Sequence, residues 1–221
     1  MRVLQHDEST GLIGEPTPGA AVWGVVSTGN PLMDGAAALR HGAPRVVLHS
    51  GRLGGDGLAG DIATWSPPGM SALDSFCDVV GPLLIERGQR ALFMPHHAHV
   101  LSDVQRCVKF LLARREQPFG IVLRPLALLA SSMLARAEDH LRRCLETLGP
   151  MCDALWLETN SGDADPRGVE DDGEARTGIP ASRGTIDSAA MFRLVGAYVG
   201  PDTTVIVAPA DLGALMASRR T

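Results

Sequence analysis

The sequence has 221 residues, of which 45% are hydrophobic and 20% are charged, and its formal net charge at pH 7 is −5. A chain of this length is long enough to bury a core as one domain, and its composition excludes disorder as a global state. The acidic balance and the lack of a lysine or arginine run argue against nucleic acid or an anionic membrane as a partner.

The first ten residues lack the basic and apolar segments of a secretory leader, and no apolar run approaches the ~20 residues that cross a bilayer. We therefore expect a cytoplasmic protein. Assembly as a homo-oligomer stays open. Cys77, Cys107 and Cys144 fall on apolar positions of predicted helices, which indicates reduced core thiols and not a disulfide or zinc site.

Six short apolar runs predict buried strands, because they lack the polar alternation of a half-exposed strand. In chain order they are Val22–Val26, Val46–His49, Ala91–Met94, Gly120–Leu123, Ala154–Leu157 and Thr204–Val207. Apolar residues at helical spacing predict four helices between or after these strands. The helices are Ser71–Arg87, Ser102–Leu112, Met133–Leu148 and Asp187–Val199, the second opened by a capping box of Ser102 and Gln105.

Alternating strands and helices predict parallel pairing through right-handed crossovers, since adjacent parallel strands need a covering connection. No glycine-rich phosphate loop follows a strand, which argues against a doubly wound nucleotide-binding sheet and against a nucleotide cofactor. We therefore predict one α/β domain over 1–221, a TIM (β/α) barrel of six to eight parallel strands. A complete barrel typically has ~250 residues, so we expect the ring to be shortened or atypical at Met1–Ala21 and after Ala210.

Four segments match one family in their order and spacing. Leu39–Gly51 is similar to a strand that ends in His-Pro-Gly, and Ala91–His99 lies where a strand ends in a ligand glutamate. Phe119–Leu129 resembles a strand that closes in Asp-x-x-His, and Arg183–Leu194 resembles a Gly-x-Ile-Asp turn into a late helix. Together they resemble the xylose-isomerase-like TIM-barrel superfamily, which contains sugar-phosphate isomerases and epimerases and the type-four apurinic endonucleases.

The resemblance implies an isomerase or epimerase with a divalent metal held by carboxylates and histidine. Most of the family's ligand positions hold other residues in this chain, namely Met94, Arg124, Ala127, Trp156 and Ala208. Only His49 is retained. A hard cation needs anionic or imidazole ligands, so the family's metal site cannot be carried over unchanged.

The sequence His96-His97-x-His99 follows a predicted strand at its C-terminal end, where TIM-barrel active sites are built. With His49 from the neighbouring strand, His97 and His99 form a candidate three-imidazole site for one divalent ion, Zn, Mn or Fe. The alternative needs no metal: His97 is then the catalytic acid or base and His96 contacts the substrate. A third hypothesis gives these histidines no function: they lie in a polar loop and form hydrogen bonds only to backbone groups or solvent.

Arg124 follows another predicted strand and is expected to bind a phosphate or carboxylate of a sugar-like substrate, or else to pair with Glu158 in place of the metal's charge. Glu158 is itself a candidate catalytic base. Residues 160–184 are acidic and contain glycine and proline, which predicts a flexible loop at the rim. His6 and His140 are expected at the surface.

These residues predict an enzyme that acts on a small carbohydrate or sugar phosphate by proton transfer, with or without assistance from a metal at the rim histidines. The alternative is a catalytically degenerate barrel that binds a ligand or a protein partner. The lost carboxylates favour the second hypothesis, and the histidines at the expected rim favour the first.

Overall fold

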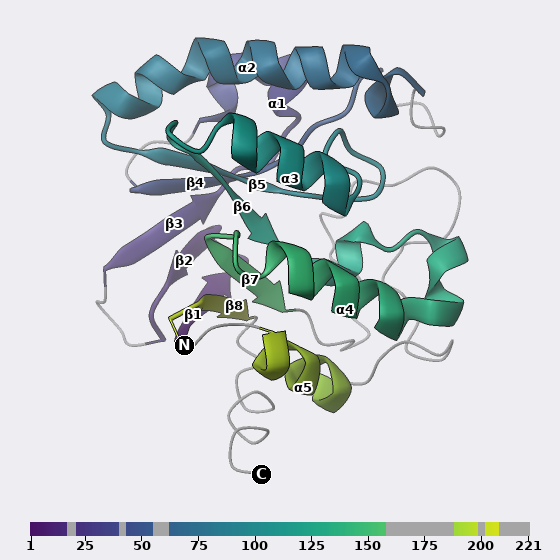
Figure 1. Ribbon diagram of the computed structural model, residues 1–221. Coiled ribbons are helices and arrows are strands. Elements are labelled where there is room, and N and C mark those ends of the chain that lie inside the picture. Colours follow the sequence, from purple (N-terminus) through teal and green to yellow (C-terminus); the bar gives the residue numbers. More distant parts are fainter. Residues whose placement is uncertain (17–20, 40–42, 55–61, 158–187, 199–201, 208–221) are drawn as a thin grey trace.

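A closed barrel of eight strands forms the centre of the computed structural model, in the order β1 to β8 (Figure 1). The structure describes residues 1–16, 21–39, 43–54, 62–157, 188–198 and 202–207. The strands are β1 Arg2–Asp7, β2 Leu12–Gly14, β3 Val22–Val26, β4 Arg45–His49, β5 Arg90–Met94, β6 Phe119–Leu123, β7 Ala154–Leu157 and β8 Thr204–Val207. The predicted TIM (β/α) fold and all six predicted strands are confirmed. The acidic loop predicted over 160–184 lies outside the described residues.

The six predicted strands are parallel to one another where they pair, and the ring is atypical within Met1–Ala21, as expected: β2 runs antiparallel to both β1 and β3. A tight turn makes this reversal. The Asp7 carboxylate accepts hydrogen bonds from the hydroxyl groups of Ser9 and Thr10, at 2.7 and 2.8 Å. Gly11 follows with a φ of +71°, a conformation that glycine adopts without strain. The N-terminal hairpin thereby completes the ring that the six predicted strands leave open.

Helices pack on the outside of the barrel beside β4 to β8 (Figure 1). In the described part of the chain they are α1 Pro31–Asp34, α2 Pro67–Glu86, α3 Val104–Ala113, α4 Ala137–Leu148 and α5 Ser188–Tyr198, and short 3-10 turns lie in some of the connections. The predicted capping box at Ser102 is wrong, because the Asp103 carboxylate caps α3 by accepting the N–H of Arg106 at 3.0 Å. No helix in the described part of the chain is long and apolar enough to cross a membrane.

Two apolar layers follow from the alternation of side chains along each strand. Inward-facing residues fill the barrel and are Leu4, Ile13, Trp23, Val47, Leu92, Met94, Val122, Ala154, Trp156 and Ile206. Outward-facing residues pack against the helices, where the Phe93 ring contacts Phe76, Phe110 and Phe119. The three cysteines expected in helices are buried in this outer layer, and burial raises the pKa of the Cys77 and Cys144 thiols to about 12.

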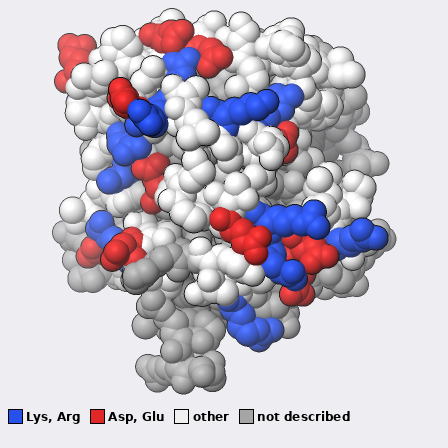
Figure 2. All heavy atoms as spheres, viewed as in Figure 1, with Lys and Arg blue, Asp and Glu red and all other residues white. Residues whose placement is uncertain are grey.

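The outer surface carries both signs of charge in close alternation over the face shown in Figure 2. Many of these charges are paired across or along helices. The nearly buried Arg114 guanidinium joins α3 to α2 through Asp74 and Asp78, at 2.8 and 2.7 Å. Because the signs alternate, this face offers no basic stripe.

Polar groups close the barrel at the N-terminal ends of its strands. The Arg45 guanidinium lies over the Trp23 ring at 4.7 Å, and Arg90 pairs with Asp153 at 3.2 Å. The Asp153 carboxylate occupies the space above Gly120 in β6, where a Cβ atom would come within 1.9 Å of it. With this end filled, the opposite end of the barrel is left for a ligand.

We therefore expect Gly120→Ala to lower the free energy of unfolding by about 1–3 kcal/mol, because the added methyl meets Asp153 and Leu92. Urea unfolding measures the change. Gly196→Ala is the matched control: no atom of the described residues lies within 4 Å of its Cβ position in α5, and alanine there should stabilise or be neutral. Equal stability of wild type and Gly120→Ala would contradict this packing.

Candidate functional site

The C-terminal ends of the parallel strands bring the predicted site residues to one rim. His49 ends β4 and is paired in register with Met94, which ends β5. Arg124 directly follows β6, and Trp156 faces inward near the end of β7. Glu158, the predicted catalytic carboxylate, lies outside the described residues. The placement matches the end of the barrel at which TIM-barrel active sites are built.

The loop that carries His96, His97 and His99 is fixed to both neighbouring loops. The backbone N–H of His97 donates to the Ala127 carbonyl at 2.8 Å, on the β6 side. The N–H of Val100 donates to the Gly51 carbonyl at 2.9 Å, on the β4 side. These bonds immobilise the loop, so its histidines are preorganised for a ligand.

The imidazole rings form a continuous row. Ring centroids lie 4.4 Å apart for His97 and His96, 4.8 Å for His96 and His99, and 5.3 Å for His99 and His49. Of the predicted metal ligands, His49 and His99 are thus in direct contact, whereas His97 contacts His96. All four side chains are partly exposed.

Two rings of this row are held uncharged at neutral pH. Burial, reinforced by His97 and Arg124, lowers the pKa of His96 to about 3. Burial, reinforced by His96 and His49, lowers the pKa of His99 to about 2. Uncharged imidazoles can each donate one hydrogen bond and accept another, which suits them to contact hydroxyl groups.

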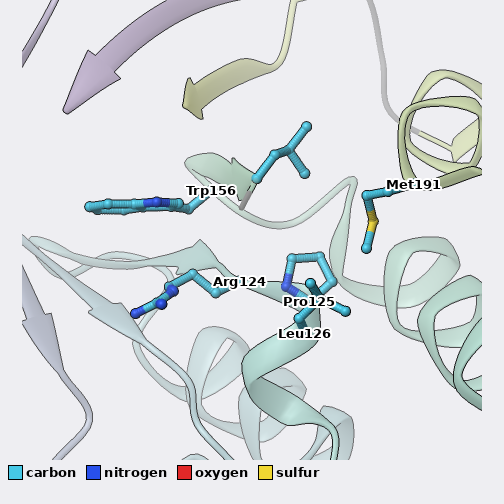
Figure 3. A pocket seen from close by; sticks show the side chains of 6 residues that line it. Arg124, Pro125, Leu126, Trp156 and Met191 are labelled. Atoms are coloured by element: carbon cyan, nitrogen blue, oxygen red, sulfur yellow. The ribbon is translucent and has the colours of Figure 1, made fainter. Parts of the chain in front are cut away.

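Beside the histidine row, the Arg124 guanidinium lies below the indole of Trp156 inside the barrel mouth (Figure 3). The distance from the guanidinium carbon to the indole centroid is 5.6 Å, within the range of a cation–π interaction. The His6 ring contacts the same indole at 4.7 Å. The expectation that His6 is a surface residue is therefore wrong: it was made without recognising β1, whose alternation turns this side chain inward.

Two further residues shape the site and carried no recognisable signal in the sequence. Trp65, in a 3-10 turn before α2, donates its indole N–H to the His97 carbonyl at 3.1 Å. Its own carbonyl accepts from Arg106 of α3, which connects the histidine loop to the helix layer. Met191 of α5 lines the space beside Trp156 (Figure 3). Both contacts depend on tertiary packing between distant segments.

The described residues do not fit a divalent metal. No three His, Cys, Asp or Glu side chains within the described ranges are grouped so as to hold one, and this includes His49, His97 and His99. The neighbouring side chains, Met94 and Arg124, are apolar or cationic. Stabilisation of a divalent ion needs anionic ligands or several convergent imidazoles, and the described rim supplies neither.

Comparison with known proteins adds no family assignment. No family model matches the chain, and no curated protein matches it. A structure of L-ribulose 3-epimerase is similar over 80% of this chain and 54% of that one, with 12% identity and a TM-score of 0.47. The probable 3-DHS dehydratase AsbF involved in petrobactin synthesis from Bacillus anthracis is similar over 80% and 61%, with 13% identity and a TM-score of 0.48.

The chain thus spans just over half of the length of these two structures, and its class rests on its own strand order. The fold expected from the resemblance to xylose-isomerase-like barrels, a TIM (β/α) barrel, is confirmed by that order. The described rim of this barrel carries a histidine row and the guanidinium of Arg124.

The lowered pKa values of His96 and His99 predict acid sensitivity. Between pH 6.5 and about 3 the unfolded chain binds protons that folded His96 does not bind, so the free energy of unfolding falls as the pH falls. Each such histidine changes that free energy by up to about 1.4 kcal/mol per pH unit. Urea unfolding of His96→Gln and His99→Gln at pH 7.5 and 5.0 should show a weaker pH dependence than wild type.

His140→Gln provides the control, because His140 lies on α4, away from the histidine row. It should keep the pH dependence of wild type. If His96→Gln and His99→Gln lose as much stability between pH 7.5 and 5.0 as wild type does, the fold does not hold these two histidines uncharged.

Proposed function

We propose that the protein is an enzyme of the isomerase or epimerase class that acts on a small carbohydrate or sugar phosphate by proton transfer. The supporting observation is the row of four imidazoles beside the Arg124 guanidinium at the C-terminal mouth of the barrel. Imidazole moves protons near neutral pH, and guanidinium binds phosphate or carboxylate groups through paired hydrogen bonds. The combination suits a hydroxylated ligand that carries an anionic group.

His97 is the proposed base, and His96 and Arg124 are the proposed substrate contacts. The described rim supplies positive charge through Arg124, which can stabilise the oxyanion that forms when a proton leaves a carbon next to a carbonyl. Glu158 stays a proposed second catalytic group, since its strand ends one residue earlier at the same rim. No step of this mechanism is assigned to a metal, because the described residues do not form a ligand group.

The second candidate function is a barrel that binds a ligand without catalysis. The observation in its favour is that Met94 and Trp156 pack into the mouth, at or near positions where the resemblance implies metal ligands. A binding protein and a proton-transfer enzyme differ in one property: only the enzyme exchanges a carbon-bound proton of its ligand with solvent.

Binding of a sugar phosphate is tested by thermal unfolding with D-ribulose 5-phosphate, D-fructose 6-phosphate or inorganic phosphate. A ligand that binds the native state stabilises it by about 2.7 kcal/mol at one hundred times its Kd, which raises Tm by several degrees. We expect at least one sugar phosphate to raise the Tm of wild type, and Arg124→Gln to remove most of the increase.

Arg115→Gln is the matched control for Arg124→Gln, because it removes the same charge from an exposed site after α3. It should retain the full increase in Tm. An equal response of wild type and Arg124→Gln, or no response to any of the three compounds, would contradict the proposed function.

A further inference from the structure

We infer that His96 and His97 hold opposite tautomers, in which Nε2 of His97 accepts a proton while Nε2–H of His96 donates a hydrogen bond to the substrate oxygen. The inference rests on the proposed function and deepens it. It assigns polarisation of the substrate carbonyl to the His96 imidazole, and the reaction then needs a single base, His97.

Backbone hydrogen bonding determines the tautomer of His96. Its Nδ1 lies 3.1 Å from the backbone N–H of Ala98, which can only donate. Nδ1 must therefore carry the lone pair, and a neutral ring then carries its proton on Nε2. The Ala98 N–H is fixed within a turn, because the next N–H, that of His99, donates to the His96 carbonyl at 2.9 Å.

The partner of His97 imposes the opposite tautomer. Its Nδ1 lies 3.3 Å from the Ala127 carbonyl oxygen, which can only accept. Nδ1 must carry the proton in this contact, so the lone pair of the neutral ring is on Nε2. The same carbonyl accepts the His97 backbone N–H at 2.8 Å, which fixes backbone and ring together.

The two rings and Arg124 are positioned by one structural unit. The His96 and His97 centroids lie 4.4 Å apart with an interplanar angle of 31°, so the two rings lie against each other. Arg124 begins the 3-10 turn Pro125–Leu128, and its carbonyl accepts the N–H of Ala127 at 3.1 Å. The turn that orients His97 therefore also places the guanidinium.

These roles define a balanced reaction on an α-hydroxycarbonyl compound. Nε2 of His97 takes the proton from the hydroxyl-bearing carbon, the C–H electron pair forms the carbon–carbon double bond, and the carbonyl electron pair moves to oxygen. Nε2–H of His96 hydrogen-bonds to this oxyanion and keeps its own proton. The protonated His97 then returns the proton to the adjacent carbon on the same face, while a proton passes between the two substrate oxygens.

Return of the proton on the same face interconverts an aldose and a ketose. Epimerisation with inversion at one carbon requires a proton from the opposite face, and hence a second acid. The His96–His97 pair therefore favours an aldose–ketose isomerase acting on a sugar that carries a phosphate or carboxylate for Arg124.

The tautomers are measured directly by long-range ¹H–¹⁵N correlation spectra of protein labelled with ¹⁵N-histidine at pH 7.5. Spectra of His96→Gln and His97→Gln assign the two rings, and His140→Gln identifies a histidine away from the site. We expect the Nε2–H tautomer for His96 and the Nδ1–H tautomer for His97. The same tautomer in both rings, or a charged His96, would overturn the pair.

The roles are tested by deuterium incorporation into D-ribulose 5-phosphate and D-fructose 6-phosphate in D₂O with EDTA. We expect incorporation next to the carbonyl, its loss in His97→Gln, and a decrease of at least about tenfold in His96→Leu. His96→Gln keeps an N–H near the Nε2 position and should retain more activity than His96→Leu. Equal rates in these two variants would overturn the donor role of His96.

Failure of the pair and failure of the proposed function give different results. Deuterium incorporation with the wrong tautomers would overturn the pair and leave the proposed function standing. Correct tautomers with no incorporation, although a sugar phosphate raises Tm, would overturn the catalytic role of the pair and favour the ligand-binding barrel.

Discussion

The register of the parallel strands is the constraint on which the site depends. Because side chains alternate along a strand, pairing His49 with Met94 directs both toward the barrel mouth and directs Leu48 and Phe93 into the helix layer. A shift of one residue would exchange these two sets. The large outer core, which includes Phe93, therefore fixes which side chains face the barrel mouth.

Sequence patterns were sufficient for the parts of the fold that follow from local chemistry. Buried apolar runs identified β3 to β8. Because His49 ends one of these runs and Arg124 follows another, the sequence also predicted that both side chains lie at the same rim of the barrel. The hairpin of β1 and β2 was not predicted, because β1 mixes polar and apolar residues and β2 has three residues. The contact of His6 with Trp156 was missed for the same reason, since it exists only when β1 closes the ring.

The described side chains at the mouth give it a positive electrostatic character. In the described part of the rim, Arg124 is cationic and stacks on Trp156, while burial keeps His96 and His99 uncharged. An anionic ligand is attracted to such a site, and a divalent cation is repelled unless anionic ligands offset the charge. The hydrogen bond proposed from His96 Nε2–H to a substrate oxyanion is consistent with this field.

We propose that imidazole and guanidinium groups carry out the chemistry at this mouth without a metal ion. The Tm of the purified protein is measured after dialysis against EDTA, and again after addition of Zn²⁺ or Mn²⁺, for wild type and His49→Ala. We expect the same Tm for wild type under all three conditions. A Tm that falls with EDTA, recovers with metal and no longer recovers in His49→Ala would overturn this proposal.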